Sequence, residues 1–456
     1  MFKEDTITAI STSMGYGGIA IIKISGKDSF EVIKKIFKRS ANRSFDDMGK
    51  SSIAYGHIVD EVGTILDEVL VSKMNAPHTY TTEDVVEINC HGGMTAVKNV
   101  LDLVLRSGAR IADAGEFTKR AFLNGRIDLS QAEAVSDVIM AKTALASRSA
   151  LSQLSGELSK EINVIKKAIL KLLSHLEVTI QYPEYDIEDV TDEELVMELE
   201  VIRNHIARLI STYKKGEILK EGLKVAICGK PNVGKSQLLN ALIGQNKAIV
   251  TEIAGTTRDI VDEFINLSGV PVKIIDTAGI RESDDLVESI GIKRSISTIN
   301  ESDVVLLVVD GSKALDELDR SIIESAKDKT VIAVVNKSDL GLDDSVVDTL
   351  AKFDMVKISA LNKINLEELE DKLYNLAISA DEVVSDAIVT NARHKNMLLE
   401  AFTAIECAIN AHRELVPIDF VEIDIRQCLE SLGKITGETV SEDLIDEIFA
   451  NFCLGK

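Results

Sequence analysis

Residues 229–236 read Gly-Lys-Pro-Asn-Val-Gly-Lys-Ser, and they follow directly on the apolar run 223–228. A helical pattern begins near Gln237. A glycine-rich turn between a buried strand and a helix lets backbone N–H groups surround phosphate oxygens. In such a turn Lys235 supplies a positive charge to the outer phosphates of a nucleotide, and the Ser236 hydroxyl binds Mg²⁺. The segment therefore predicts a phosphate-binding loop inside an α/β domain.

Two segments downstream supply the other groups of a magnesium site. Asp276-Thr277-Ala278-Gly279 ends the apolar run 272–275, where the carboxylate can reach Mg²⁺ through water and the glycine N–H can meet the terminal phosphate. Residues 255–259 read Gly-Thr-Thr-Arg-Asp, and Thr257 is the natural second hydroxyl ligand. The first segment is a strong signal only in combination with the others, and the second is also consistent with a polar surface loop. Their order along the chain favours the nucleotide site.

The base is chosen by Asn336-Lys337-Ser338-Asp339, which follows the apolar run 330–335. The Asp339 carboxylate can accept both N–H groups on the edge of guanine, whereas adenine offers no matching pair of donors. Ser359-Ala360, after another apolar run, can present a backbone N–H to the guanine oxygen. The sequence therefore predicts GTP with Mg²⁺ as the ligand, in preference to ATP.

The residue that orients the attacking water is left open by the motifs. Ile280 occupies the position where many switch GTPases carry a glutamine. The following segment offers four acidic candidates, Glu282, Asp284, Asp285 and Glu288, and their spacing does not choose among them. No arginine finger is evident, although Arg258 and Arg281 lie nearby. A monovalent cation held by Asn232 and by backbone carbonyls of the 251–256 loop can meet the transferred charge instead.

Apolar runs divide the chain into domains. Strand-like and helical patterns alternate over residues 221–378, which predicts an inserted, Ras-like α/β P-loop G domain with a doubly wound, mostly parallel sheet. Residues 1–118 mix short strands (19–24, 68–73, 85–89) with helices (30–37, 96–106), which predicts an N-terminal α+β domain. Residues 119–220 and 379–456 are helical and predict one all-α domain that the G domain interrupts. The helical series are Leu151, Leu154, Leu158, Ile162, Ile165, Ile169, Leu172 and Leu176; Leu195, Leu199, Ile202, Ile206 and Leu209; Met397, Ala401, Ile405 and Ile409; and Leu444, Ile448 and Phe452.

Composition narrows the class of protein. The 456 residues are 45% apolar without a run long enough to cross a membrane, and charges at Lys3, Glu4 and Asp5 argue against a signal peptide, so a cytoplasmic protein is predicted. Five scattered cysteines fit reduced thiols. The formal net charge of −23 repels nucleic acid at long range. Any role with nucleic acid then needs a local basic patch or a partner's surface.

Several further segments together resemble the MnmE (TrmE) family of tRNA-modification GTPases, and the similarity covers essentially the whole chain. They are Thr251-Glu252-Ile253-Ala254-Gly255-Thr256-Thr257-Arg258-Asp259, the terminal Cys453-Leu454-Gly455-Lys456, and residues 17–26, 83–87, 91–93 and 115–125 of the N-terminal part. The resemblance implies K⁺ bound by Asn232, Thr251, Ile253 and Thr256, and Mg²⁺ bound by Ser236 and Thr257. It selects Glu288 to place the water. It also implies a constitutive homodimer held by the N-terminal domains, in which the G domains meet across the nucleotides when GTP and K⁺ are bound.

The predicted nucleotide and cation contacts form one set. They are Asn232, Val233, Gly234, Lys235, Ser236 and Gln237; Thr251, Glu252, Ile253, Ala254, Gly255, Thr256 and Thr257; Asp276, Thr277, Ala278 and Gly279; Asn336, Lys337 and Asp339; and Ser359 and Ala360.

The same resemblance implies a one-carbon folate, 5-formyl- or methylene-tetrahydrofolate, on the N-terminal domain. The matching positions are Lys23, Glu87, Arg126 and Lys456. Lys23 stands where an arginine is usual, so the charge is kept but the planar fork of donors is lost. The family acts with a flavin-bearing partner, MnmG (GidA), in a heterotetramer that adds an aminomethyl or carboxymethylaminomethyl group to the wobble uridine of tRNA. FAD would then sit on the partner.

Other functions compete with this one. A GTP-switched assembly factor for the ribosome would share the G domain, but it would more plausibly carry a basic RNA-binding module. A membrane-linked GTPase finds no anchor or basic amphipathic helix in the sequence. Cys453 is open to two interpretations, a thiolate nucleophile or a small residue packed near a helix end.

Overall fold

The computed structural model describes residues 5–40, 43–181, 192–245, 248–249, 263–275, 298–377, 387–452 and 455. The chain forms two compact units. The first comprises residues 1–139, 153–181 and 418–456, and the second residues 140–152 and 182–417. Within the described ranges, no helix combines the length and the apolar content that a membrane span requires.

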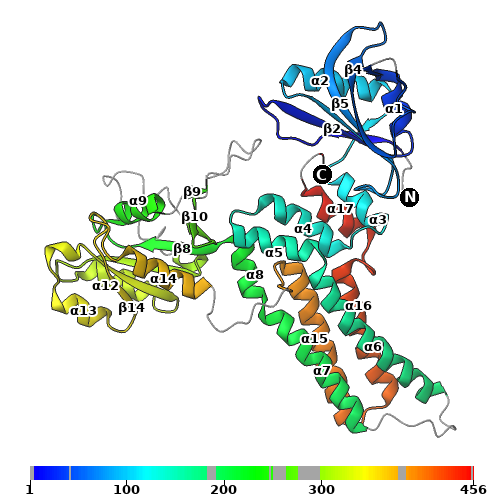
Figure 1. Cartoon of the computed structure of the whole chain (residues 1–456). Coiled ribbons are helices and arrows are strands. Elements are labelled where there is room, and N and C mark those ends of the chain that lie inside the picture. Colours follow the sequence, from blue (N-terminus) through cyan, green and yellow to red (C-terminus); the bar gives the residue numbers. More distant parts are fainter. Residues whose placement is uncertain are drawn as a thin grey trace. The chain divides into compact units, whose positions relative to one another are not determined.

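A seven-stranded sheet forms the N-terminal part of the first unit (Figure 1). Its order is β3-β4-β5-β6-β2-β1-β7, and the neighbours are antiparallel except for β1 and β7. The elements are β1 (Ile7–Ile10), β2 (Ile19–Ser25), α1 (Ser29–Ile36), β3 (Phe37–Arg39), β4 (Ser51–Val59), β5 (Ile65–Met74), β6 (Val85–His91), α2 (Met94–Arg106) and β7 (Arg110–Ile111). The predicted α+β domain is confirmed.

Alternation along β2 and β6 divides the sheet into two faces. Ile22, Ile24 and Ile88 are buried beneath α1 and α2 in one apolar cluster. Successive side chains of a strand point to opposite faces, so Lys23 and Glu87 lie on the other face. The strand register pairs these two residues directly. The sheet therefore presents a lysine and a glutamate together on the face that α1 and α2 leave uncovered.

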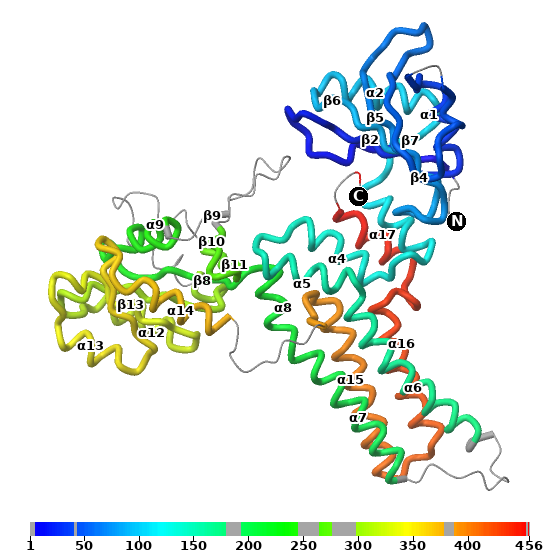
Figure 2. Tube along the Cα trace, viewed as in Figure 1, coloured from blue at the N-terminus to red at the C-terminus, as the bar shows by residue number. Residues whose placement is uncertain are grey.

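Five helices complete the first unit: α3 (Glu116–Leu123), α4 (Leu129–Met140), α6 (Glu157–Gln181), α16 (Ile418–Thr436) and α17 (Glu442–Ala450). Helices α6 and α16 run side by side (Figure 2). The periodic series that starts at Leu151 is not one helix, because α5 (Ala144–Leu154) ends before Gly156 and α6 begins after it. Gly156 has φ 88°, a left-handed conformation that interrupts a helix and favours glycine.

In the second unit, α7 (Asp192–Ser211) and α15 (Ala392–Arg413) pack along each other, and α8 (Tyr213–Glu221) leads into the α/β domain (Figure 2). The segment that precedes α15 lies on α8. There the Val389 N–H donates to Thr212 Oγ1 at 3.0 Å. A Cβ added to Gly216 would lie 2.1 Å from the Val389 carbonyl oxygen. The chain that enters the α/β domain and the chain that leaves it are thus in backbone contact.

Replacing Gly216 with alanine is expected to destabilise this unit. The alanine would gain about 1 kcal/mol of helix propensity, but displacing Val389 costs about 1–3 kcal/mol, so a net loss is expected. Urea unfolding of the full chain measures it. Gly244→Ala is the matched control, because a Cβ there meets nothing within 4 Å, and it should leave stability equal or higher. Equal unfolding midpoints for the two variants would contradict the contact.

The α/β domain of the second unit contains another seven-stranded sheet, ordered β14-β13-β12-β8-β11-β10-β9. Its strands are β8 (Leu223–Cys228), β9 (Ala248–Ile249), β10 (Glu263–Leu267), β11 (Val270–Ile275), β12 (Val304–Asp310), β13 (Thr330–Asn336) and β14 (Asp354–Lys357). The helices are α9 (Lys235–Gln245), α12 (Glu317–Ser325), α13 (Asp344–Leu350) and α14 (Leu366–Ala377), with a 3₁₀ turn, η2 (Ser338–Leu340). Strands β8, β11, β12, β13 and β14 are parallel, whereas β9 and β10 are antiparallel to their neighbours.

Two apolar clusters show that both faces of this sheet are covered. Leu238 of α9 and Leu369 of α14 pack on one face. Ile322 of α12 and Val346 of α13 pack on the other. Because both faces are buried, β12 and β13 are apolar at nearly every position. The predicted doubly wound, mostly parallel sheet is confirmed.

Candidate functional site

The phosphate-binding loop lies between the carboxyl end of β8 and the first residue of α9. Gly229 passes so close to β12 that a Cβ would lie 2.2 Å from the Val308 carbonyl oxygen. Asn232 has φ 63°, a left-handed conformation that asparagine tolerates better than most residues. Gly234 has φ 99°, and a Cβ there would lie 2.2 Å from Asn336 Nδ2. Both glycines are therefore required by close approach of other atoms.

Lys235 and Ser236 occupy the amino end of α9, where backbone N–H groups and the helix dipole favour an anion. The Lys235 ammonium donates to the carbonyl oxygens of Gly229 at 2.8 Å and Lys230 at 2.9 Å. The Lys235 side chain therefore connects the end of the loop to its first two residues. Ser236 and Gln237 are exposed beside it. The arrangement leaves a hydroxyl and an ammonium at the mouth of an anion-binding turn.

Asn336 links the guanine motif to the phosphate-binding loop. Its side chain is buried, and Nδ2 donates to the Val233 carbonyl oxygen at 2.8 Å. Its Oδ1 accepts from the Ala360 N–H at 2.9 Å. Ser359 is also buried, and its Oγ accepts from the Asn362 N–H at 3.2 Å. One side chain therefore joins the three segments that the sequence assigned to the phosphates and the base.

Lys337 makes a second link between the same segments. Its φ is 62°, and its ammonium donates to the Asn232 carbonyl oxygen at 2.9 Å and to Asp310 Oδ2 at 2.7 Å. Burial by itself raises the pKa of Asp310, but the hydrogen bonds from Lys337 and Ser312 hold it below its ordinary value. Asp310 was missed by the sequence analysis. Its position at the carboxyl end of β12, next to the strand that carries the guanine motif, is the signal that identifies it.

Asp339 lies exposed in η2, two residues after Lys337. A carboxylate there is open to a ligand and is carried by a turn whose preceding residues are tied to the phosphate-binding loop. The remaining predicted contacts, at 251–257 and 276–279, fall outside the described residues, as does Glu288 with the other acidic candidates at 282–285.

A second group of predicted residues meets on the uncovered face of the N-terminal sheet. Lys23 Nζ lies 3.8 Å from Glu87 Oε1 and 5.3 Å from the centre of the Tyr80 ring. The Arg126 guanidinium carbon lies 4.7 Å from the centre of that ring, and the side chain donates to the Tyr80 carbonyl oxygen at 3.0 Å. Burial raises the pKa of the Tyr80 phenol. Tyr80, which the sequence analysis did not select, is thus the common contact of both cations.

The carboxyl end of the chain reaches the same sheet. The Ser11 hydroxyl donates to the Gly455 carbonyl oxygen at 3.1 Å. Gly455 has φ 83°, and a Cβ there would lie 2.3 Å from the Ile10 carbonyl oxygen. Its neighbours Lys456 and Cys453 lie outside the described residues. The close packing of Gly455 brings the end of the chain to β1.

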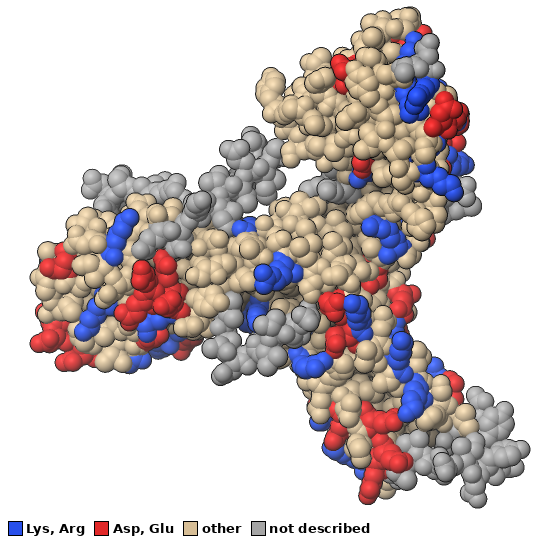
Figure 3. Space-filling model, viewed as in Figure 1, with Lys and Arg blue, Asp and Glu red and all other residues tan. Residues whose placement is uncertain are grey.

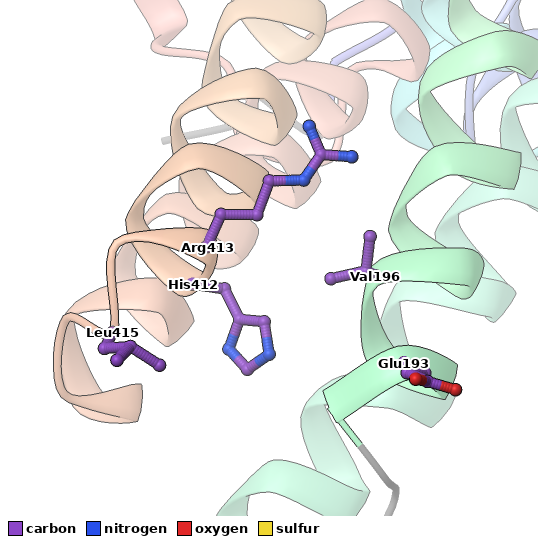
Figure 4. A pocket seen from close by; sticks show the side chains of 5 residues that line it. All are labelled: Glu193, Val196, His412, Arg413 and Leu415. Carbon is purple, nitrogen blue, oxygen red and sulfur yellow. The ribbon is translucent and has the colours of Figure 1, made fainter.

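One surface hollow lies away from these sites. A hollow of about 380 Å³ lies between the ends of α7 and α15 (Figure 4), and its lining side chains are Glu193, Val196, His412, Arg413 and Leu415. None of these five is a predicted site residue. On the face drawn in Figure 3, lysine and arginine side chains are scattered among acidic ones. In the described parts of the chain, no group of three or more His, Cys, Asp or Glu side chains is arranged to hold a metal ion.

Two protein families match this chain, and their matches together include the phosphate-binding loop and the segments on either side of it. A family described as the GTP-binding protein TrmE N-terminus matches residues 6–126, and one described as the MnmE helical domain matches residues 129–453. Among solved structures, the G domain of the T. maritima FeoB iron transporter is 29% identical over 34% of this chain and 99% of its own, with a TM-score of 0.26.

Full-length relatives agree with these matches. The tRNA modification GTPases MnmE of Clostridioides difficile (strain 630) and Alkaliphilus metalliredigens (strain QYMF) are each 47% identical over 100% of both chains. That of Thermoanaerobacter sp. (strain X514) is 49% identical over 99% of each chain. The chain therefore belongs to the MnmE family of tRNA modification GTPases.

Proposed function

We propose that this protein is a potassium-dependent GTPase that acts with a flavin-bearing partner, MnmG, to add an aminomethyl or carboxymethylaminomethyl group to C5 of the wobble uridine of tRNA. The observation that carries the proposal is the direct bonding of the guanine motif to the phosphate-binding loop through Asn336 and Lys337. Full-length identity to MnmE relatives supports the tRNA substrate. The G domain would comprise residues 221–378, between the helical segments 119–220 and 379–456 and after the N-terminal domain 1–118.

In this proposal the described residues bind and orient GTP. Backbone N–H groups of residues 229–236 and the Lys235 ammonium hold the phosphates, and Asp339 accepts from the guanine edge. The donor set at Ser236, Thr257 and Asp276 is all oxygen, which suits Mg²⁺, and the ion when bound would neutralise phosphate charge. Glu288 would orient the attacking water. The bonds from Asn336 and Lys337 hold the loop in place, so that its N–H groups are positioned for the phosphates.

Asn232 is the proposed side-chain ligand of K⁺, with Thr251, Ile253 and Thr256. Asn232 has a left-handed backbone and an exposed side chain. Its carbonyl oxygen already accepts from Lys337, so the side-chain amide oxygen is the group proposed to bind the cation. The amide oxygen is a neutral ligand, which suits a monovalent cation. Paired G domains of a homodimer would then close over the ion.

The cluster of Lys23, Glu87, Tyr80 and Arg126 fits a one-carbon folate. Two cations can pair with carboxylates, a glutamate can accept from ring N–H groups, and an aromatic ring can stack on a flat heterocycle. Lys456 would join from the end of the chain, whose Gly455 packs on the same sheet. The folate would supply the one-carbon unit, and FAD on MnmG would supply the redox chemistry.

The net charge of −23 supports a shared substrate site. A chain with this excess of negative charge attracts tRNA weakly by itself, so most of the phosphate contacts would come from MnmG in a cytoplasmic heterotetramer. The rival function, a GTP-switched RNA assembly factor, would require a basic surface on this chain.

Replacing Na⁺ with K⁺ is expected to raise the rate of GTP hydrolysis by about tenfold or more, because the cation meets charge in the transition state. The stimulation should grow with protein concentration as G domains pair. Phosphate release in matched chloride buffers at several protein concentrations measures it.

Asn232→Gly is the informative variant for this experiment. It removes the amide oxygen while keeping a residue that adopts φ 63° without strain. The variant should bind GDP but lose the response to K⁺. Equal, slow rates in both buffers for the wild-type protein would contradict the potassium mechanism and shift weight to the assembly factor.

A further inference from the structure

Lys230, the second residue of the phosphate-binding loop, directs its side chain away from the loop toward the start of α12. Its ammonium lies 2.6 Å from Asp319 Oδ2 and 2.9 Å from Asp316 Oδ2. The Lys230 side chain is half-buried, and the Asp319 side chain is only 2% exposed. Burial alone would lower the pKa of Lys230, but the hydrogen bonds to Asp319 and Asp316 raise it. The Lys230 side chain is therefore charged at neutral pH.

The two carboxylates are held in place by the helix they begin. Asp316 is the N-cap of α12 and accepts from the Asp319 N–H at 3.0 Å, while Asp319 accepts from the Asp316 N–H at 3.2 Å. This reciprocal capping box leaves neither carboxylate free to swing. Helix α12 is itself seated by Ile322 and Ile323 in the apolar cluster on the sheet. Lys230 is thus bonded to a rigid point of the domain.

The other two anchors of the loop hold its middle. Asn336 bonds the Val233 carbonyl and Lys337 bonds the Asn232 carbonyl. Lys230 is the anchor of the first half, and its own carbonyl oxygen accepts from Lys235. Residues that flank the phosphate-binding turn on both sides are therefore tied to α12 and β13. A loop fixed in this way loses little conformational entropy when it closes on a phosphate.

We propose that Lys230, paired with Asp316 and Asp319, is a positioning residue that holds the first half of the phosphate-binding loop in its nucleotide-binding conformation. The inference rests on the proposed binding of GTP and GDP by this loop. A lysine in a phosphate-binding loop would ordinarily act as a ligand, but two carboxylates already compensate the charge of Lys230. Its contribution is therefore made equally to bound substrate and transition state, and it affects affinity more than the chemical step.

Lys230→Met in the full chain should release a fluorescent GDP analogue about fivefold to tenfold faster than the wild-type protein. The KM for GTP should rise by a similar factor, with kcat within about twofold of the wild-type value. Lys230→Arg should restore most of the affinity, because an arginine can also reach both carboxylates. Stopped-flow release and steady-state hydrolysis at saturating K⁺ measure these effects.

Two further variants separate the tether from other effects. Asp319→Asn keeps the capping acceptor but removes the charge, so it should also speed release of the GDP analogue. The double variant Lys230→Met with Asp319→Asn should release the analogue no faster than Lys230→Met alone. Lys327→Met removes the exposed ion pair with Glu324 at the other end of α12 and should behave as wild type. Thermal unfolding of each variant tests whether α12 remains folded.

Three results would count against the tether. Equal release rates for Lys230→Met and Lys327→Met would overturn it. Slower release by Asp319→Asn would also overturn it, since a freed Lys230 would then be a phosphate ligand. A wild-type protein that binds no guanine nucleotide would overturn the proposed function, and the tether with it. The measurement on the wild-type protein comes first, so this outcome is distinguished from a failure of the tether alone.

Discussion

Replacing Asp339 with asparagine is expected to change the base that the nucleotide site accepts from guanine to xanthine. Asp339 lies exposed in η2, one turn after Asn336 and Lys337, which are both bonded to the phosphate-binding loop. Its carboxylate can accept two N–H groups of guanine, whereas an asparagine amide presents a donor to the N–H groups on that edge. Affinity for GDP should fall by at least about 100-fold, because a lost charge-assisted pair is replaced by a mismatch.

The same variant should gain affinity for XDP, whose edge carries an oxygen where guanine carries an amino group. Titration of both nucleotides against the wild-type protein and Asp339→Asn measures the exchange. Asp344→Asn is the matched control, since Asp344 is a neighbouring exposed aspartate in the first turn of α13. A variant that keeps the wild-type preference for GDP would show that Asp339 does not read the base.

Replacing Arg120 with methionine is expected to destabilise the first unit by about 3–5 kcal/mol, since it removes the buried guanidinium that three carboxylates share. Arg120 is 2% exposed. Its guanidinium donates to Asp5 Oδ1 at 2.7 Å, Glu83 Oε1 at 3.0 Å and Glu116 Oε1 at 2.9 Å. Urea unfolding measures the loss. Arg110→Met is the control. Arg110 also pairs with Asp5 and Glu116, but its side chain is more exposed, so its replacement should cost less stability.

The pKa values of the carboxylates that Arg120 contacts predict how the stability of the first unit changes with pH. Burial raises the pKa of Asp5 and Glu116, but the hydrogen bonds from Arg110 and Arg120 hold both below their ordinary values of 3.8 and 4.5. Carboxylates with lowered pKa stabilise the folded state above those ordinary values, and this stability is lost as the pH falls through the lowered pKa.

Wild-type stability should therefore decrease on acidification below about pH 4.5. Arg120→Met should lose much less stability over that range, because protonation relieves the repulsion that the substitution creates. Parallel pH profiles for the two proteins would show that Arg120 does not compensate these carboxylates.

Contiguous motifs made much of the fold and the site predictable. The strands 223–228, 304–309 and 330–335 are apolar at nearly every position, since both faces of their sheet are covered. The phosphate-binding turn was predictable because its glycines, lysine and serine are adjacent in the chain. The break at Gly156 was not, because the leucine pattern continues across it and only the backbone conformation reveals the interruption.

Residue type and local spacing in the sequence predict which groups meet phosphate and guanine, and the same motifs already indicate the family of the chain. The distant side chains that support the candidate site are visible only in the folded structure. Lys230 meets Asp319 across 89 positions, and Arg120 meets Asp5 across 115. Long flexible side chains find such partners through the packing of helices and strands, so no local pattern encodes these contacts.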